Sequence, residues 1–167
     1  SRSRSPNLFM RCFEPRAEEL AKKYALAPYT MFIGSGALWG ETILFSMCIL
    51  EEMQWKRTRY ITSADFFHGT LELVEPGVPV FLFMGEDENR KLDERVRAFL
   101  NRGVTGDTDI NIIDTAEFAI PGLDDEFRVI VSPWILSSLV TDRLAAYYET
   151  VTKHNLKYRR YYHQFDY

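Results

Sequence analysis

Residues 29–54 read YTMFIGSGALWGETILFSMCILEEMQ, and this stretch decides the fold. Its beginning, residues 29–33, predicts a short buried strand because it is a mostly apolar run of strand length. A tight turn follows at residues 34–36, and residues 37–54 predict a long helix that is apolar on almost every side. Because such a helix needs cover on several sides, we expect it to lie between a sheet and another layer or subunit.

Strands and helices alternate along the rest of the chain. Further strands are predicted at residues 59–62, 78–84 and 110–113, and further helices at residues 14–26, 87–100 and 123–154. A break is expected in the last helix at Pro133, which lacks the N–H that a helix interior needs. Because this alternation builds a parallel sheet with helices on both faces, we expect an α/β fold, a three-layer α/β/α sandwich around four to five parallel strands.

Charge and hydropathy exclude two kinds of partner. The chain has 167 residues, as one domain does, and its net charge of −4 argues against a general nucleic-acid coat. Residues 157–163, KYRRYYH, interleave basic and aromatic side chains, but no other basic run accompanies them. We interpret them as a packed tail whose arginines face a phosphate or a partner subunit.

The longest apolar run, residues 43–50, is far shorter than the ~20 residues that cross a bilayer. We therefore expect neither nucleic acid nor a membrane as a partner.

Cysteine usage and the first residues bear on the cellular compartment. Cys12 and Cys48 are too few for a disulfide framework and have no histidine set beside them for zinc. The start, SRSRS, lacks the apolar stretch of a secretory signal. These features predict a protein of the reducing cytoplasm.

Ligands of parallel sheets bind at the carboxyl ends of the strands, close to helix N-termini. In this chain those ends are residues 34–36, 63–68 and 85–89. The glycine-rich turn at 34–36 offers backbone N–H groups to an anion or a sugar oxygen, although it fits an ordinary tight turn equally well.

Two glutamates, Glu51 and Glu52, end the apolar helix. Burial and the negative end of the helix dipole both raise the pKa of a carboxyl group, which suits a general base that returns its proton near neutral pH. The alternative is a solvated pair at a fraying helix end. Spacing alone does not choose between the two glutamates, because apolar residues line the faces of both.

A single histidine, His68, lies in a loop at the expected active edge, between two phenylalanines and Gly69. An imidazole titrates near neutral pH and moves protons between oxygens, which favours a catalytic role. The alternative is an ordinary surface histidine.

Three segments together resemble the sugar isomerase (SIS) family. They are residues 33–36 with the helix after them, residues 52–55 (EMQW) and residues 63–69 (SADFFHG). The likeness is closest to the second SIS domain of fructosamine-6-phosphate deglycases, such as fructoselysine- or glucoselysine-6-phosphate deglycase. A more distant likeness is to the isomerase half of glucosamine-6-phosphate synthase.

The likeness runs from about residue 15 to the closing residues of the chain. It implies a flavodoxin-like SIS domain over residues 14–154, with a leader or inter-domain linker at residues 1–13. Residues 155–167 are then a C-terminal tail that packs near the active site.

The resemblance also implies catalytic roles. The family's catalytic glutamate falls on Glu52 rather than Glu51, since its partner histidine falls on His68, sixteen residues later. His68 assists opening of the sugar ring, and Glu52 takes a proton from C1 of the ketoamine and returns one at C2. The imine then hydrolyses to glucose 6-phosphate and an amine or amino acid, with no metal and no cofactor. The substrate-binding residues expected from the likeness are Ser35, Gly36, Arg159 and Arg160.

The chain departs from the family pattern in two ways. Full-length members carry two SIS domains and this chain spans about one, so we expect a homodimer or an assembly with an N-terminal SIS half. The family's Ser/Thr-rich phosphate loop is replaced at residues 85–89 by GEDEN, whose acidic side chains repel a phosphate. The phosphate site then lies on a missing N-terminal segment or on a separate chain, or is lost together with catalysis.

The expected function is therefore that of a sugar-phosphate deglycase half-molecule. The alternatives are an aldose–ketose phosphosugar isomerase and a non-catalytic module for sugar-phosphate binding or assembly.

Overall fold

The computed structural model describes residues 8–103, 106–118 and 120–166, and its centre is a parallel sheet. The strands are β1 (Thr30–Ile33), β2 (Thr58–Ile61), β3 (Val80–Met84) and β4 (Ile110–Asp114), in the order β2-β1-β3-β4. Phe32 of β1 pairs with Phe81 of β3, and Leu82 of β3 pairs with Ile112 of β4. The predicted α/β class is confirmed, with four parallel strands.

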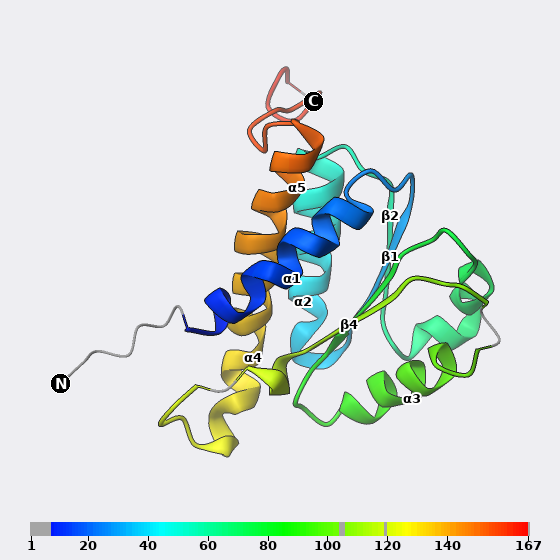
Figure 1. Cartoon of the computed structure of the whole chain (residues 1–167), viewed down its shortest axis with the longest axis vertical. Helices are drawn as coiled ribbons and strands as arrows, with labels where there is room; N and C mark the ends of the chain where they lie inside the picture. Colours follow the sequence, from blue (N-terminus) through cyan, green and yellow to red (C-terminus); the bar gives the residue numbers. More distant parts are fainter. Residues whose placement is uncertain (1–7, 104–105, 119, 167) are drawn as a thin grey trace.

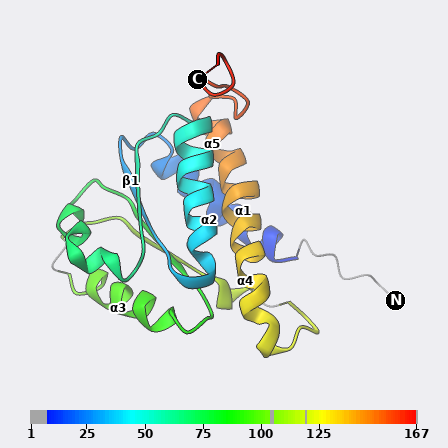
Figure 2. The ribbon, with the colours of Figure 1, turned by 180° about the vertical axis from the view of Figure 1, so that it is seen from behind.

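Helices cover both faces of the sheet (Figure 1). The helical elements are α1 (Leu8–Tyr24), η1 (Gly36–Leu38), α2 (Trp39–Ile43), η2 (Leu44–Met53), η3 (Asp65–His68), η4 (Thr70–Leu73), α3 (Arg90–Leu100), η5 (Thr115–Glu117), η6 (Asp125–Phe127), α4 (Arg128–Ser137), η7 (Ser138–Leu144) and α5 (Ala145–Thr152). One face carries α1, the α2–η2 helix and the α4–α5 run, and the other carries α3 (Figures 1 and 2). This arrangement confirms the three-layer α/β/α sandwich.

Side chains alternate between the two faces of the central strands, so each face has its own apolar core. Phe32, Phe81 and Phe83 point to the side of α1, η2 and η7. Met31, Val80 and Leu82, among others, point to the side of α3 and η3, where they meet a smaller cluster. Both β1 and β3 are buried along their whole length, as two-sided parallel strands are.

The long helix predicted at residues 37–54 is present, but much of it, η2, is wound as a π-helix. Its inner side is covered, since Phe45, Ile49 and Leu50 are buried. Its outer side is less covered than expected, because Met47 is 40% exposed. The all-round burial expected from its composition is therefore incomplete within this chain.

The break expected at Pro133 is wrong: the proline lies inside α4, and the helix continues past it. Proline at this position deprives the Val129 carbonyl of its usual N–H donor. The Ser132 hydroxyl donates to that carbonyl at 3.1 Å instead, which compensates for the missing bond. The first helix also begins earlier than expected, at Leu8 rather than residue 14, and Phe13 is part of the core.

The helical run Asp125–Thr152 is long and apolar enough to cross a membrane by length and composition alone. In this structure the run packs against α1, and Leu139, Val140 and Leu144 are fully buried there. This place in the core accounts for part of its apolar character, since 44% of its most apolar stretch is buried.

Candidate functional site

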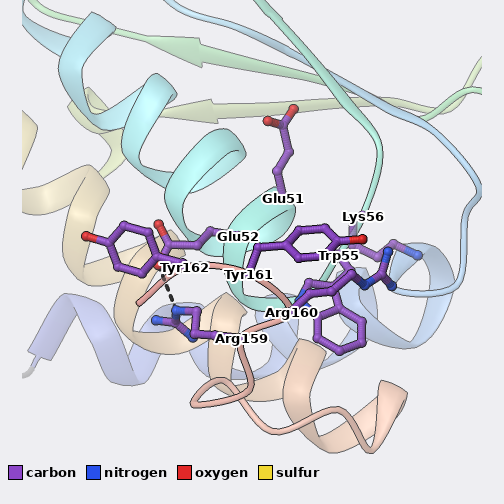
Figure 3. Close-up of a pocket in the computed structure, with 8 residues that line it drawn as sticks. All are labelled: Glu51, Glu52, Trp55, Lys56, Arg159, Arg160, Tyr161 and Tyr162. Carbon is purple, nitrogen blue, oxygen red and sulfur yellow. Dashed lines mark ion pairs between the residues drawn. The ribbon is translucent and has the colours of Figure 1, made fainter. Parts of the chain in front are cut away.

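A cavity of about 470 Å³ opens where η2 ends and the C-terminal tail lies against it (Figure 3). The residues that line it are Glu51, Glu52, Trp55, Lys56, Arg159, Arg160, Tyr161 and Tyr162. Three of the six expected site residues, Glu52, Arg159 and Arg160, therefore lie in one pocket. We call it the Glu52 pocket.

An ion pair joins the two sides of the Glu52 pocket. Arg159 Nε from the tail lies 2.9 Å from Glu52 Oε1 at the helix end. The side chain of Glu52 is 30% exposed and that of Arg159 is 19% exposed. The Glu52 carboxylate is thus partly solvated and ion-paired, and apolar groups do not enclose it.

The two glutamates that the sequence could not tell apart have different surroundings. Glu51 Oε1 accepts a hydrogen bond of 2.5 Å from Thr58 Oγ1, at the start of β2. In Figure 3 its carboxylate points away from the tail, whereas that of Glu52 points toward Arg159 and Tyr162. Glu52 is the carboxylate that the tail contacts.

The helix end itself has an unusual backbone. Trp55 has φ of 53°, in the left-handed region that glycine normally occupies after a helix. A bulky residue in this conformation costs about 1–3 kcal/mol. The conformation places the indole beneath the tail, where the Arg160 guanidinium lies 4.3 Å from the ring centroid.

Gln54 attaches the beginning of the tail to the helix end. This residue is only 4% exposed, and its amide nitrogen donates to the His154 carbonyl at 2.7 Å. The Thr152 hydroxyl donates to the amide oxygen of Gln54 at 2.8 Å. His154 in turn packs edge-on against Trp55, with 4.3 Å between the ring centroids.

Ser35, expected to line the sugar site, lies at the opposite, carboxyl edge of the sheet in a buried network. Its Oγ accepts from the Ser63 N–H at 2.7 Å, and the Ser63 hydroxyl donates to Asp93 at 2.5 Å. The other Asp93 oxygen accepts from the Gly85 N–H. Burial raises the pKa of Asp93 to about 6. The network ties together the ends of β1, β2 and β3.

Gly36 lies at the same edge, against an acidic side chain. Asp87 Oδ2 accepts from the Ala37 N–H at 2.5 Å, at the start of the long helix. Gly36 has φ of +55°, and a Cβ there would clash with the same carboxylate oxygen. Glu86 is paired with Arg128. The acidic loop at residues 85–89 is therefore used for internal contacts, including one at the position where a bound anion would meet the helix N-terminus.

His68 ends η3 and is exposed, on the α3 side of the sheet. Glu52 lies on the other face, at the far end of a helix that starts at the carboxyl edge and runs from Trp39 to Met53. That length is roughly 20 Å at about 1.5 Å per residue. Within one chain the structure does not bring Glu52 and His68 together, and it places Ser35 and Gly36 away from the Glu52 pocket as well.

Four lining residues had no role assigned from the sequence: Trp55, Lys56, Tyr161 and Tyr162. The aromatic content of the tail was visible, but its contact with the helix end depends on long-range packing. Within the described residues, no group of three or more His, Cys, Asp or Glu side chains is placed to hold a metal ion.

No family model matches the chain. Fructosamine deglycase FrlB of Bacillus subtilis is 30% identical over 148 residues, which are 87% of this chain and 43% of that protein. Fructoselysine 6-phosphate deglycase of Escherichia coli is 31% identical over 156 residues, which are 92% of this chain and 42% of that protein.

A solved structure agrees with the similarity to these sequences. The crystal structure of a proposed phosphosugar isomerase from Bacillus subtilis superposes with a TM-score of 0.86 at 26% identity, over 95% of this chain and 48% of that one. The chain is therefore similar, over most of its length, to proteins of the sugar isomerase (SIS) family. Within that family it is similar to the fructosamine and fructoselysine 6-phosphate deglycases, and it spans less than half the length of these relatives.

Proposed function

We propose that this domain is one half of a sugar-phosphate deglycase, which cleaves a fructosamine 6-phosphate to glucose 6-phosphate and an amine or amino acid. The observation that carries the proposal is that Arg159 holds the Glu52 carboxylate in a pocket. The chain that forms this pocket is about 30% identical to deglycases. A carboxylate positioned in a cavity large enough for part of a sugar is the group that such a proton transfer needs.

In the proposed mechanism Glu52 is the general base and needs no metal ion. It removes a proton from C1 of the ketoamine. The electron pair of the broken C1–H bond forms a C1–C2 double bond as the C2 carbonyl oxygen takes up a proton. Glu52 then delivers a proton to C2, which leaves a protonated imine between C1 and nitrogen. Water adds to C1 of the imine and the C1–N bond breaks, releasing the amine and the C1 aldehyde of glucose 6-phosphate.

Arg159 has a positioning role in this scheme. Its Nε contacts Oε1 of Glu52, which fixes the plane of the carboxylate. The ring-opening step is assigned to His68, and the distance between the two elements that carry these residues argues that a second domain completes the site. A homodimer, or an assembly with another SIS half, then supplies the histidine and the phosphate-binding loop to the Glu52 pocket.

The test is a product assay on the protein, alone and with any N-terminal SIS half. Fructoselysine 6-phosphate should give equimolar glucose 6-phosphate and lysine, measured by a coupled dehydrogenase and by amino-acid analysis. Binding without turnover in either form would contradict the proposal and support a non-catalytic module.

An aldose–ketose phosphosugar isomerase is the second candidate, favoured by the neighbour described as a phosphosugar isomerase. It shares proton transfer between C1 and C2 but releases no amine. Interconversion of fructose 6-phosphate and glucose 6-phosphate, with no lysine released from fructoselysine 6-phosphate, would establish the isomerase instead.

A further inference from the structure

Two cations line the Glu52 pocket without an anionic partner. Arg159 is paired with Glu52, but among the residues that the structure describes, no carboxylate lies within ion-pair distance of Lys56 or Arg160. Glu51, the other acid in the pocket, is bonded to Thr58. The pocket therefore has positive charge that its own acids do not neutralise.

Lys56 is held in place by the helix end. Its backbone N–H donates to the Leu50 carbonyl at 2.8 Å, and its side chain is half-buried. Burial lowers the pKa of Lys56, because desolvation disfavours the charged ammonium form. A partly desolvated ammonium group without a counter-ion is stabilised when an anion binds beside it.

Arg160 is oriented by Trp55. The guanidinium carbon lies over the indole, 4.3 Å from the ring centroid, and the strained left-handed backbone of Trp55 supports this arrangement. Guanidinium N–H groups bind carboxylate or phosphate oxygens in a bidentate manner.

At the carboxyl edge of the sheet, two groups that could bind an anion are already occupied. The N–H of Ala37 is already bound by Asp87, and Arg128 is already paired with Glu86. An anionic substrate group approaching this edge meets the acidic side chains of residues 85–89.

We propose that Lys56 and Arg160 form an oxyanion subsite of the Glu52 pocket, which binds an anionic group of the ketoamine phosphate whose C1 and C2 lie at Glu52. The inference rests on the proposed function, and it names the part of the substrate that this half of the site recognises. Fructoselysine 6-phosphate carries two such groups, the phosphate at C6 and the carboxylate of lysine.

The experiment measures the affinity of the chain for three ligands by calorimetric titration. These are fructoselysine 6-phosphate, unphosphorylated fructoselysine, and the 6-phosphate of the cadaverine ketoamine, which lacks the carboxylate. K56Q and R160Q should each weaken binding of fructoselysine 6-phosphate about tenfold, or 1.4 kcal/mol. K157Q is the matched control, because it removes a positive charge from the exposed tail outside the pocket.

Two of the ligands each lack one anionic group of fructoselysine 6-phosphate. K56Q and wild type should bind equally to the ligand that lacks the group recognised by the subsite. Loss of the effect with the cadaverine compound assigns the carboxylate, and loss with fructoselysine assigns the phosphate. Equal affinities of K56Q, R160Q and wild type, or an equal loss in K157Q, overturn the subsite while leaving the deglycase proposal in place. Failure of the wild type to bind any of the three ligands, also when the N-terminal SIS half is present, contradicts the proposed function, and the subsite with it.

Discussion

Replacing Asp93 with asparagine should change how the stability of the domain depends on pH. Asp93 is 1% exposed, on α3, and its carboxylate accepts hydrogen bonds from Ser63 Oγ and the Gly85 N–H. Burial is the main cause of its raised pKa, and Asp87 nearby adds to it. The two hydrogen bonds and the positive charge of Arg90 oppose the rise.

The magnitude follows from the shift. The pKa of Asp93 rises from an ordinary 3.8 to about 6, so the folded state favours the protonated form. Its stabilising contribution is complete below pH 3.8 and is lost as the pH rises through about 6. A shift of about two units at 1.36 kcal/mol per unit corresponds to a loss of about 3 kcal/mol between pH 3.5 and pH 7.

The assay is urea unfolding of wild type and D93N at pH values from 3.5 to 7. The asparagine changes the hydrogen bonding by an amount that does not depend on pH, so the difference in unfolding free energy between the two proteins isolates the titration. That difference should shift by about 3 kcal/mol in favour of D93N as the pH rises to 7. D124N, which removes an exposed carboxylate, serves as the control for net charge. A difference between wild type and D93N that stays constant within 1 kcal/mol across this range would refute the reasoning.

Four further substitutions test other parts of the structure. Q54A leaves the His154 carbonyl without its buried donor and should lower the unfolding free energy by about 1–3 kcal/mol in urea titrations; a loss below 0.5 kcal/mol would show that Gln54 does not hold the tail. G36A should destabilise the domain by at least about 1 kcal/mol, because Gly36 has a left-handed φ and lies beside the Asp87 carboxylate. G40A, whose Cβ meets nothing within 4 Å, should stabilise the helix by up to about 1 kcal/mol. Equal effects of the two variants in thermal unfolding would contradict this pair of predictions. R159Q should lower kcat about tenfold with a smaller change in KM, because it releases the Glu52 carboxylate without removing it; an unchanged kcat would remove Arg159 from its positioning role.

Much of the fold was predictable because local patterns and packing agree. The apolar run at residues 78–84 became β3, and the spacing of apolar residues at 87–100 became α3. The expectation failed at Pro133 because the compensating bond comes from the hydroxyl of the residue before it. From the sequence alone, a serine hydroxyl has several possible hydrogen-bond acceptors. Which of them it contacts is determined only in the folded helix.

The candidate site was harder to predict, because both the closing of the carboxyl edge and the Glu52 pocket depend on contacts between segments that are distant in the sequence. The rule that ligands bind at the carboxyl ends of strands directed attention to Ser35, Gly36 and His68. The structure closes much of that edge with its own acids, Asp87 and Asp93, and forms a pocket at the other end of the long helix. Only folding brings Arg159 to Glu52, more than a hundred residues earlier in the chain.

The most direct test of the central claim compares E52Q with E51Q on fructoselysine 6-phosphate in D₂O. Both changes remove one carboxylate from neighbouring positions of one helix end, and the glutamine at 51 retains an acceptor for Thr58. The assignment of Glu52 as the base predicts that E52Q loses about 10²–10⁴-fold in the rate of glucose 6-phosphate release, while E51Q stays within tenfold of wild type. It also predicts that wild type and E51Q place deuterium at C2 of the product, as seen by NMR. An E52Q protein that releases glucose 6-phosphate at the wild-type rate would contradict the assignment of Glu52 as the base.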